Sequence, residues 1–203
     1  MAATSLAVSL LVAPEAPSTA DVVPPGKITV DVVTVNGSGC PAGTAAVAVA
    51  DDNTAFTVTY SDYTAQAGAG STPTQFRKNC QLNLRVHYPQ GFTYGIAKAD
   101  YRGFASLPRG AKGMQRASYY FSGSSSTGTS THNIPGPKVD NWQFTDQTSV
   151  GEIVFAPCGM VRNLNVNTEV RVTTNSSNQS AFVSMDSTDG SVNTRYQFAW
   201  KRC

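Results

Sequence analysis

Valine outnumbers leucine in this chain to a degree that restricts its fold class. Beyond residue 20 the sequence contains nineteen valines but only four leucines, together with many threonines and tyrosines. β-Branched and aromatic side chains fit a pleated, half-buried strand better than a helix, where they lose rotamer freedom. No window of a dozen residues has the apolar periodicity of an amphipathic helix. The sequence therefore predicts an all-β protein.

Apolar residues recur at every second position in several segments, which is the pattern of strands with one buried face. The clearest of these segments are 56–60, 82–88, 164–172 and 196–200. Further strand candidates, separated by turn-rich sequence, are 28–35, 44–50, 92–101, 117–122, 152–155 and 181–185. Strands of this number and spacing are typical of two packed layers. We therefore expect a two-layer antiparallel β-sandwich that is jelly-roll-like.

The length and charge of the chain exclude several classes of protein. Its 203 residues suit one domain, and an apolar fraction of 40% is sufficient for a core. Charged residues make up only 14%, and 15 Lys and Arg against 13 Asp and Glu leave a net charge of +2. This balance excludes a disordered polyelectrolyte and argues against nucleic-acid binding through bulk charge. No apolar run is long enough to span a bilayer.

The first twenty residues resemble a secretory leader. The apolar run Leu6–Val12 is followed by small residues that end at Ala20, as in a signal peptide. The first basic residue is Lys27, so the basic start is missing and we expect the recorded start to be internal to a longer leader. A disordered Ala/Ser-rich tail is the alternative. The expected organisation is a signal-peptide-like leader over 1–20, a linker over 21–27 and a single β-sandwich domain over 28–203.

Four widely spaced cysteines support export and predict two disulfides. They are Cys40, Cys80, Cys158 and Cys203, and none has the close C-x-x-C spacing of zinc or thioredoxin-like sites. Four cysteines allow three pairings. We favour Cys40 with Cys80 and Cys158 with Cys203, because two-layer β folds often join neighbouring strands in this way. Each bond would stabilise the fold by about 4 kcal/mol in the chain-entropy model. Free buried thiols are the alternative.

Residues 122–137 consist of small and polar residues without periodicity. Such a segment has little apolar surface to offset the entropy of ordering it. We expect a mobile loop here, within the single domain.

Several short segments together resemble a known family. They are Gly37–Thr44 (GSGCPAGT), Arg77–Leu82 (RKNCQL), Pro89–Phe92 with Arg102–Phe104, and Phe198–Cys203 (FAWKRC). The combination is similar to a family of small secreted proteins of filamentous bacteria and fungi, domain of unknown function 4360, over roughly residues 26–203. The most specific element is the GSGCPAG segment followed some 40 residues later by RKNC. The resemblance implies an exported, disulfide-bonded β protein and brings no catalytic residues with it.

Residues able to transfer protons are few. The two histidines are His87, which alternation places on the solvent side of a strand, and His132, which lies in the predicted loop. We expect both to be surface or hydrogen-bonding residues. A serine hydrolase would need a histidine oriented by a carboxylate, and no G-x-S-x-G elbow is present. We therefore assign no catalytic residue.

Paired carboxylates offer a second route to catalysis, since glycosidases use two across a cleft. The candidates are Glu152, Glu169 and Asp100, although a solvated ion pair with an arginine is the simpler interpretation of Glu169. The turns 51–53 and 186–190 gather oxygen ligands of the kind that calcium prefers, but neither has EF-hand spacing. Turn formation explains the same residues, so we predict no metal and no cofactor; calcium would be the first candidate.

Basic residues concentrate in the middle of the chain. Residues 77–116 contain eight Lys and Arg and one acid, Asp100, which gives this window a net charge of +7. Aromatic residues are interleaved with them, so the window combines charge with stacking surface. Scattered, merely solubilising arginines are the alternative. The predicted binding residues are Arg77, Lys78, Arg85, Tyr88, Tyr94, Lys98, Tyr101, Arg102 and Arg109.

These features lead to a hypothesis of function. We expect a secreted, extracellular, non-catalytic binding module for a polysaccharide, a cell wall or a partner protein, with residues 77–120 as its contact face. A glycan hydrolase or lyase that uses the carboxylates is one alternative, and a structural component of the cell surface is another. Neither nucleic acid nor a membrane span is expected. The sequons at Asn36, Asn175 and Asn178 are glycan acceptors only in a eukaryote.

Overall fold

The computed structural model describes residues 22–175, 178–185 and 194–203, and within these ranges the protein is built from strands. The predicted leader and the turn 186–190 lie outside the described residues. The only helical segment in the described part is the 3-10 turn η1 (Val150–Glu152), and no helix there is long and apolar enough to cross a membrane. In chain order the strands are β1 (Thr29–Asn36), β2 (Ala45–Val49), β3 (Ala55–Tyr60), β4 (Thr64–Ala67), β5 (Arg77–His87), β6 (Phe92–Leu107), β7 (Lys112–Phe121), β8 (Gly128–Pro135), β9 (Lys138–Gln147), β10 (Leu164–Thr173), β11 (Ala181–Ser184) and β12 (Thr194–Arg202).

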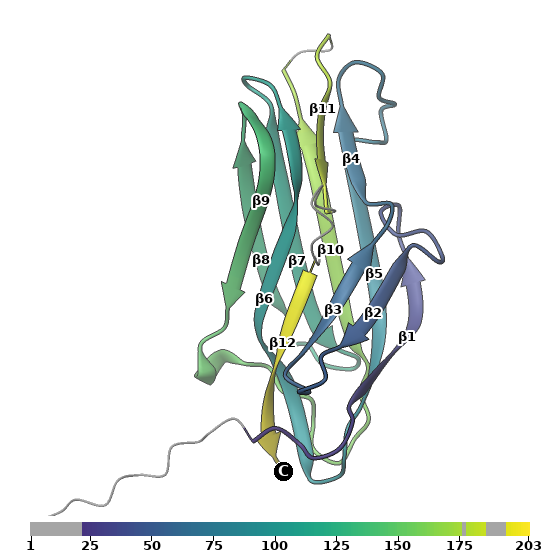
Figure 1. Ribbon diagram of the computed structural model, residues 1–203, viewed down its shortest axis with the longest axis vertical. Helices are drawn as coiled ribbons and strands as arrows, with labels where there is room; N and C mark the ends of the chain where they lie inside the picture. Colours follow the sequence, from purple (N-terminus) through teal and green to yellow (C-terminus); the bar gives the residue numbers. More distant parts are fainter. Residues whose placement is uncertain (1–21, 176–177, 186–193) are drawn as a thin grey trace, which may run out of the picture.

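The strands form two antiparallel sheets that run along the long axis of the molecule (Figure 1). The five-stranded sheet, here sheet I, has the order β1-β5-β10-β7-β8. The seven-stranded sheet, here sheet II, has the order β2-β3-β12-β6-β11-β4, and β9 pairs with β6. β12 and β11 pair one after the other with the same side of β6, at residues 92–101 and 104–106. β9 pairs with the other side of β6, at residues 98–107. The prediction of a two-layer antiparallel sandwich is confirmed.

Alternating residues of the two sheets meet in one core. Leu82, Val166 and Val170 of sheet I are fully buried, as the period of two predicts. Sheet II contributes mainly aromatic rings, among them Phe56, which stacks on Tyr196 with ring centroids 5.0 Å apart. Aliphatic side chains of the core therefore come mainly from sheet I, and rings come mainly from sheet II.

Both predicted disulfides are present, in the sequential pairing. Cys40 pairs with Cys80, and Cys158 pairs with Cys203. The first joins the β1–β2 connection to β5 of sheet I, and the second joins the end of β12 to the segment between η1 and β10. Among the described residues no cysteine is free.

The segment 122–137, expected to be a mobile loop, is in large part a strand. Gly128–Pro135 forms β8 and pairs along its length with β7. As the edge strand of sheet I, β8 needs only a narrow apolar contact, which Ile134 supplies at 2% exposure. Backbone pairing thus orders a sequence whose side chains gave no apolar period. Residues 152–155, expected to be a strand, contain instead the end of η1 and a single bridge from Phe155 to Gly95.

We predict that Leu82→Ala lowers the free energy of unfolding by about 2–5 kcal/mol, because it opens a cavity between the sheets. Urea unfolding measures the change. The matched control is Val139→Ala on β9, where the valine is 75% exposed and the expected change is about 0.5 kcal/mol or less. A loss at Leu82 no larger than that at Val139 would contradict the placement of Leu82 in the core.

Candidate functional site

A polar hollow lies on the outer face of sheet I, over β5, β10 and β7. We call it hollow I; its volume is about 290 Å³. The described residues that line it are Arg77, Asn79, Cys80, Gln81, Arg116, Ser118, Asn167, Thr168 and Glu169.

The strand register explains why the face is hollowed here. Gln81, Asn167 and Ser118 lie side by side in one row across the three strands. The next row, one pleat along, is Asn79, Glu169 and Arg116. Asn167 and Ser118 in the first row have short side chains, whereas the arginines and Glu169 around them have long ones. The short side chains leave a depression in the surface over β10.

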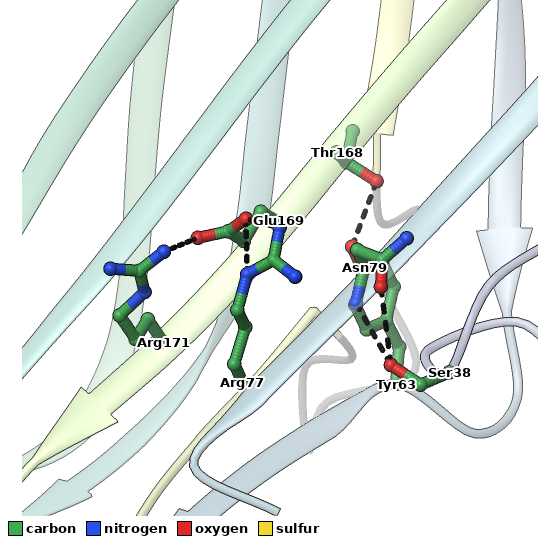
Figure 2. A network of polar contacts seen from close by, with 7 residues as sticks. All are labelled: Ser38, Tyr63, Arg77, Asn79, Thr168, Glu169 and Arg171. Carbon is green, nitrogen blue, oxygen red and sulfur yellow. Dashed lines mark hydrogen bonds and ion pairs between the residues drawn. The ribbon is translucent and has the colours of Figure 1, made fainter. Parts of the chain in front are cut away.

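Two arginines hold Glu169 at one end of hollow I (Figure 2). Nε of Arg77 donates to Oε2 of Glu169 at 2.7 Å, and Nη2 of Arg171 donates to Oε1 at 2.6 Å. The Glu169 side chain is only 13% exposed. This burial raises its pKa, but the hydrogen bonds and charges of the two guanidinium groups outweigh it, and the net pKa is lowered. Glu169 is therefore an ionised, doubly paired carboxylate.

The family-like GSGC and RKNC segments meet at the other side of hollow I. The Ser38 hydroxyl and the Asn79 side-chain oxygen are 3.3 Å apart (Figure 2). The Gly39 amide donates to the Asn79 carbonyl at 2.8 Å. Gly37 has a φ of 135°, and a Cβ there would collide with the Asn79 backbone. The Cys40–Cys80 disulfide then fixes the same two segments covalently. Asn79 is thus held in place from the side of β1.

Groups that carry no internal bond face hollow I between these two anchors. Arg116 makes no ion pair among the described residues, although it lies opposite Glu169, whose two oxygens bond to Arg77 and Arg171. Oδ1 of Asn167 is buried and has no hydrogen-bond partner. Below them, Thr168 points inward and its hydroxyl lies 3.0 Å from the hydroxyl of Tyr63 (Figure 2). Hollow I therefore offers a cation and an amide over a rigid floor.

The polar surface continues along the strands beyond hollow I. Asn83 donates to Asn165 at 2.8 Å, Asn163 donates to Asn83 at 2.7 Å, and Asn165 donates to Ser122 at 3.0 Å. Nε of Arg85 reaches Asn163 at 3.4 Å. This ladder of amides holds the neighbouring polar side chains in fixed orientations.

The structure divides the predicted binding residues among several locations. Arg77 and Arg85 lie on the outer face of sheet I, whereas Lys98 and Arg102 lie on the outer face of sheet II. Lys78 is on the opposite face of β5 from Arg77, and Arg109 is exposed in the turn after β6. The window 77–120 is therefore not one contact face.

The predicted tyrosines do not face a ligand. Tyr94 and Tyr101 are 0% exposed, and their rings belong to the core. Tyr88 is half-buried and packs edge-on against Tyr94 at 5.4 Å and Trp200 at 6.0 Å. The physical reason is strand alternation, because β6 turns Tyr101 inward and the neighbouring Arg102 outward.

Most residues that line hollow I were missing from the predicted binding set, among them Asn79 and Asn167. Arg116 belongs to the basic window but was not chosen, and Arg171 was considered only as a partner of Glu169. A signal for them exists in β10, where Asn165, Asn167, Glu169 and Arg171 alternate with buried residues. Four polar residues on one side of a central strand indicate a polar outer face.

The histidines serve structural contacts. His87 lies on the solvent side, as expected, with Nε2 2.7 Å from Oδ2 of Asp31. His132 does not lie in a free loop: it points inward from β8, its Nε2 is 2.7 Å from Oδ1 of Asp146 on β9, and its ring stacks on Phe144 at 4.3 Å. This contact joins the edges of the two sheets.

The candidate carboxylates are not assembled as an acid–base pair. Asp100 lies on the outer face of sheet II, 3.1 Å from Lys98 and 2.6 Å from the Thr145 hydroxyl, so it cannot act on the same bond as Glu169 on sheet I. Glu152 is exposed in η1. Within residues 22–175, 178–185 and 194–203, no three His, Cys, Asp or Glu side chains gather as a metal site would require.

Comparisons with known proteins show the family of this chain. A family model described as "Domain of unknown function (DUF4360)" matches residues 26–203. The chain is also similar to an "Uncharacterized secreted protein" of Arthroderma benhamiae, with 36% identity over 179 residues. That alignment covers 88% of this chain and 73% of the relative.

We predict that Glu169→Gln lowers the free energy of unfolding at neutral pH, because it removes the ion pairs with Arg77 and Arg171. The expected loss is only about 1 kcal/mol, because both arginine side chains are half-exposed. The folded-state pKa of Glu169 lies below its ordinary value of 4.5, so the stabilisation is present above that value. It is lost as the pH falls through the folded pKa, and the two proteins should become equally stable in stronger acid. Urea unfolding across this range measures it.

The matched control is Glu152→Gln in η1, which removes an exposed carboxylate that makes no ion pair among the described residues. Its stability should follow that of the unaltered protein at every pH. A Glu169→Gln deficit that persists unchanged in strong acid would show that the ion pairs are not its source.

Proposed function

Because the chain belongs to the DUF4360 family and is secreted, we propose that it is a non-catalytic extracellular module that binds an acidic polysaccharide on the outer face of sheet I. The proposal depends on one observation: the unpaired Arg116 beside the unpartnered Asn167 oxygen in hollow I. A guanidinium group binds a carboxylate through two parallel hydrogen bonds, and amide side chains bond to sugar hydroxyls.

The charge of the surrounding face supports an acidic ligand. Arg77, Arg85, Arg116 and Arg171 lie on the outer side of β5, β7 and β10. Two carboxylates share this face, Glu169 among the arginines and Asp31 on β1, opposite Arg85. Since Glu169 is neutralised by Arg77 and Arg171, the charge that faces solvent is positive. Such a surface attracts polyanions, and the attraction weakens as salt screens it.

The chemistry of the lining favours a polysaccharide over a protein partner. The centres of protein interfaces are enriched in buried tryptophan and tyrosine as well as arginine. The described residues that line hollow I include no aromatic and no large aliphatic side chain. Amides, hydroxyls and guanidinium groups match the repeated hydroxyls and carboxylates of a uronic-acid polymer.

The rigidity of the site supports the same proposal. Asn79 is fixed by Ser38 and the adjoining disulfide, and Arg77 is fixed by Glu169. Side chains that are already ordered lose little entropy on binding, which preserves affinity for a flexible, hydrated polymer.

We predict that Arg116→Gln weakens binding of polygalacturonate about tenfold, which corresponds to about 1.4 kcal/mol, and reduces its salt dependence. Isothermal titration calorimetry at low and high salt measures both. The matched control is Arg109→Gln, which removes an equally exposed charge from the turn outside the hollow and should leave the affinity nearly unchanged.

Three further probes test the ligand class. Neutral dextran should not bind, and dextran sulfate and polyphosphate separate a carboxylate preference from general polyanion binding. An Arg116→Gln affinity equal to that of the unaltered protein would contradict the assignment of hollow I. Release of reducing sugar from polygalacturonate would contradict the non-catalytic role.

A further inference from the structure

A second polar hollow lies on the outer face of sheet II, over β3, β12, β6 and β9. We call it hollow II; its volume is about 460 Å³. The described residues that line it are Thr57, Lys98, Asp100, Arg102, Gln143, Thr145, Arg195 and Gln197.

The register of sheet II places the charges of hollow II around one carboxylate. Asp100 lies opposite Arg195 on one side and Thr145 on the other, while Lys98 and Arg102 are the neighbouring outward residues of β6. The Lys98 ammonium is 3.1 Å from Asp100, and the Thr145 hydroxyl donates to the same carboxylate at 2.6 Å.

Two cations remain for a ligand. Arg102 and Arg195 make no ion pair within the described part of the chain. Hydrogen bonds from Thr54 lower the pKa of Asp52, and Arg195 acts on Asp52 only through its charge, which lowers that pKa further. The amides of Gln143 and Gln197 line the same hollow. Hollow II thus repeats the chemistry of hollow I: free guanidinium groups beside amide and hydroxyl side chains, with one internally paired carboxylate.

The two hollows face in opposite directions. β10, which forms the floor of hollow I, buries Val166 and Val170 in the core, and β6 and β12 bury Tyr101 and Tyr196 from the other side. Packed sheets are about 10 Å apart, and each hollow is on the far side of its own sheet. One extended polymer segment therefore cannot fill both hollows at once.

We propose that the protein is bivalent, with hollow I and hollow II each binding a separate segment of acidic polysaccharide, and that it cross-links such polymers outside the cell. This inference rests on the proposed function of hollow I and extends it to the opposite face. The gain is avidity, since two weak sites on one rigid body hold a polymer network more tightly than either site alone.

The number of sites is tested by calorimetry with a short oligogalacturonide, which is too small to bridge two protein molecules. The unaltered protein should bind two oligomers per chain. Arg116→Gln and the double variant Arg102→Gln/Arg195→Gln should each lose one of them. Arg109→Gln should retain both, and equal thermal unfolding temperatures would show that every variant is folded.

Cross-linking is tested by light scattering of long polygalacturonate as protein is added. With the unaltered protein, the scattering should rise to a maximum and then decrease as more protein is added. The decrease is expected because, in excess, each polymer segment binds its own protein molecule and few proteins bridge two polymers. Either hollow variant should bind the long polymer without raising its scattering. Sedimentation of the protein alone, without polymer, controls for self-association.

The outcomes separate this inference from the function it rests on. If neither the unaltered protein nor any variant binds the oligomer, the proposed function itself is wrong. If the unaltered protein binds one oligomer, and Arg116→Gln abolishes that binding, hollow I stands and the bivalent model is overturned. Scattering that persists in Arg102→Gln/Arg195→Gln would overturn it as well, since cross-linking would then not need hollow II.

Discussion

The architecture of this protein depends on the junction between the β1–β2 connection and β5. The Cys40–Cys80 disulfide, the Ser38–Asn79 contact and the Gly39 amide bond all join the same two short segments. β5 lies between β1 and β10 in sheet I, so this junction also fixes one wall of hollow I. Gly37 permits the close approach to the Asn79 backbone and Gly39 the close approach to the Tyr63 ring, and the buried disulfide then makes this approach permanent.

The sequence predicted the fold well because the fold depends on properties that are local and repeated. The excess of valine and the period-two pattern around Leu82 and Val166 are both consequences of a two-layer β core. The site was predicted less well, because proximity in sequence is not proximity on a surface. Tyr101 and Arg102 are neighbours in the chain but lie on opposite sides of β6. β8 was missed because its inward residues Ser130, His132 and Ile134 include only one aliphatic side chain, so the sequence shows no apolar period of two there.

Internal pairing decides which charges are left for a partner. Glu169 takes Arg77 and Arg171, and Asp100 takes Lys98, so each outer face keeps a few guanidinium groups without a carboxylate. A protein with almost no net charge can therefore present cationic sites on both faces. Total charge reports solubility, whereas the arrangement of pairs determines where a polyanion can be bound.

The contact between β8 and β9 affects how readily a strand of another molecule can add to the edges of the two sheets. Sheet edges offer unpaired backbone groups to which a strand of another molecule can add, and such addition leads to aggregation. Here His132 reaches from one edge to Asp146 on the other and stacks on Phe144, so side chains bridge the opening between the sheets. Pro135 and Pro137, which lack amide donors, follow directly at the end of β8. Addition of a foreign strand at this side of the sandwich is therefore opposed by side chains that already bridge the two edges and by prolines that offer no amide.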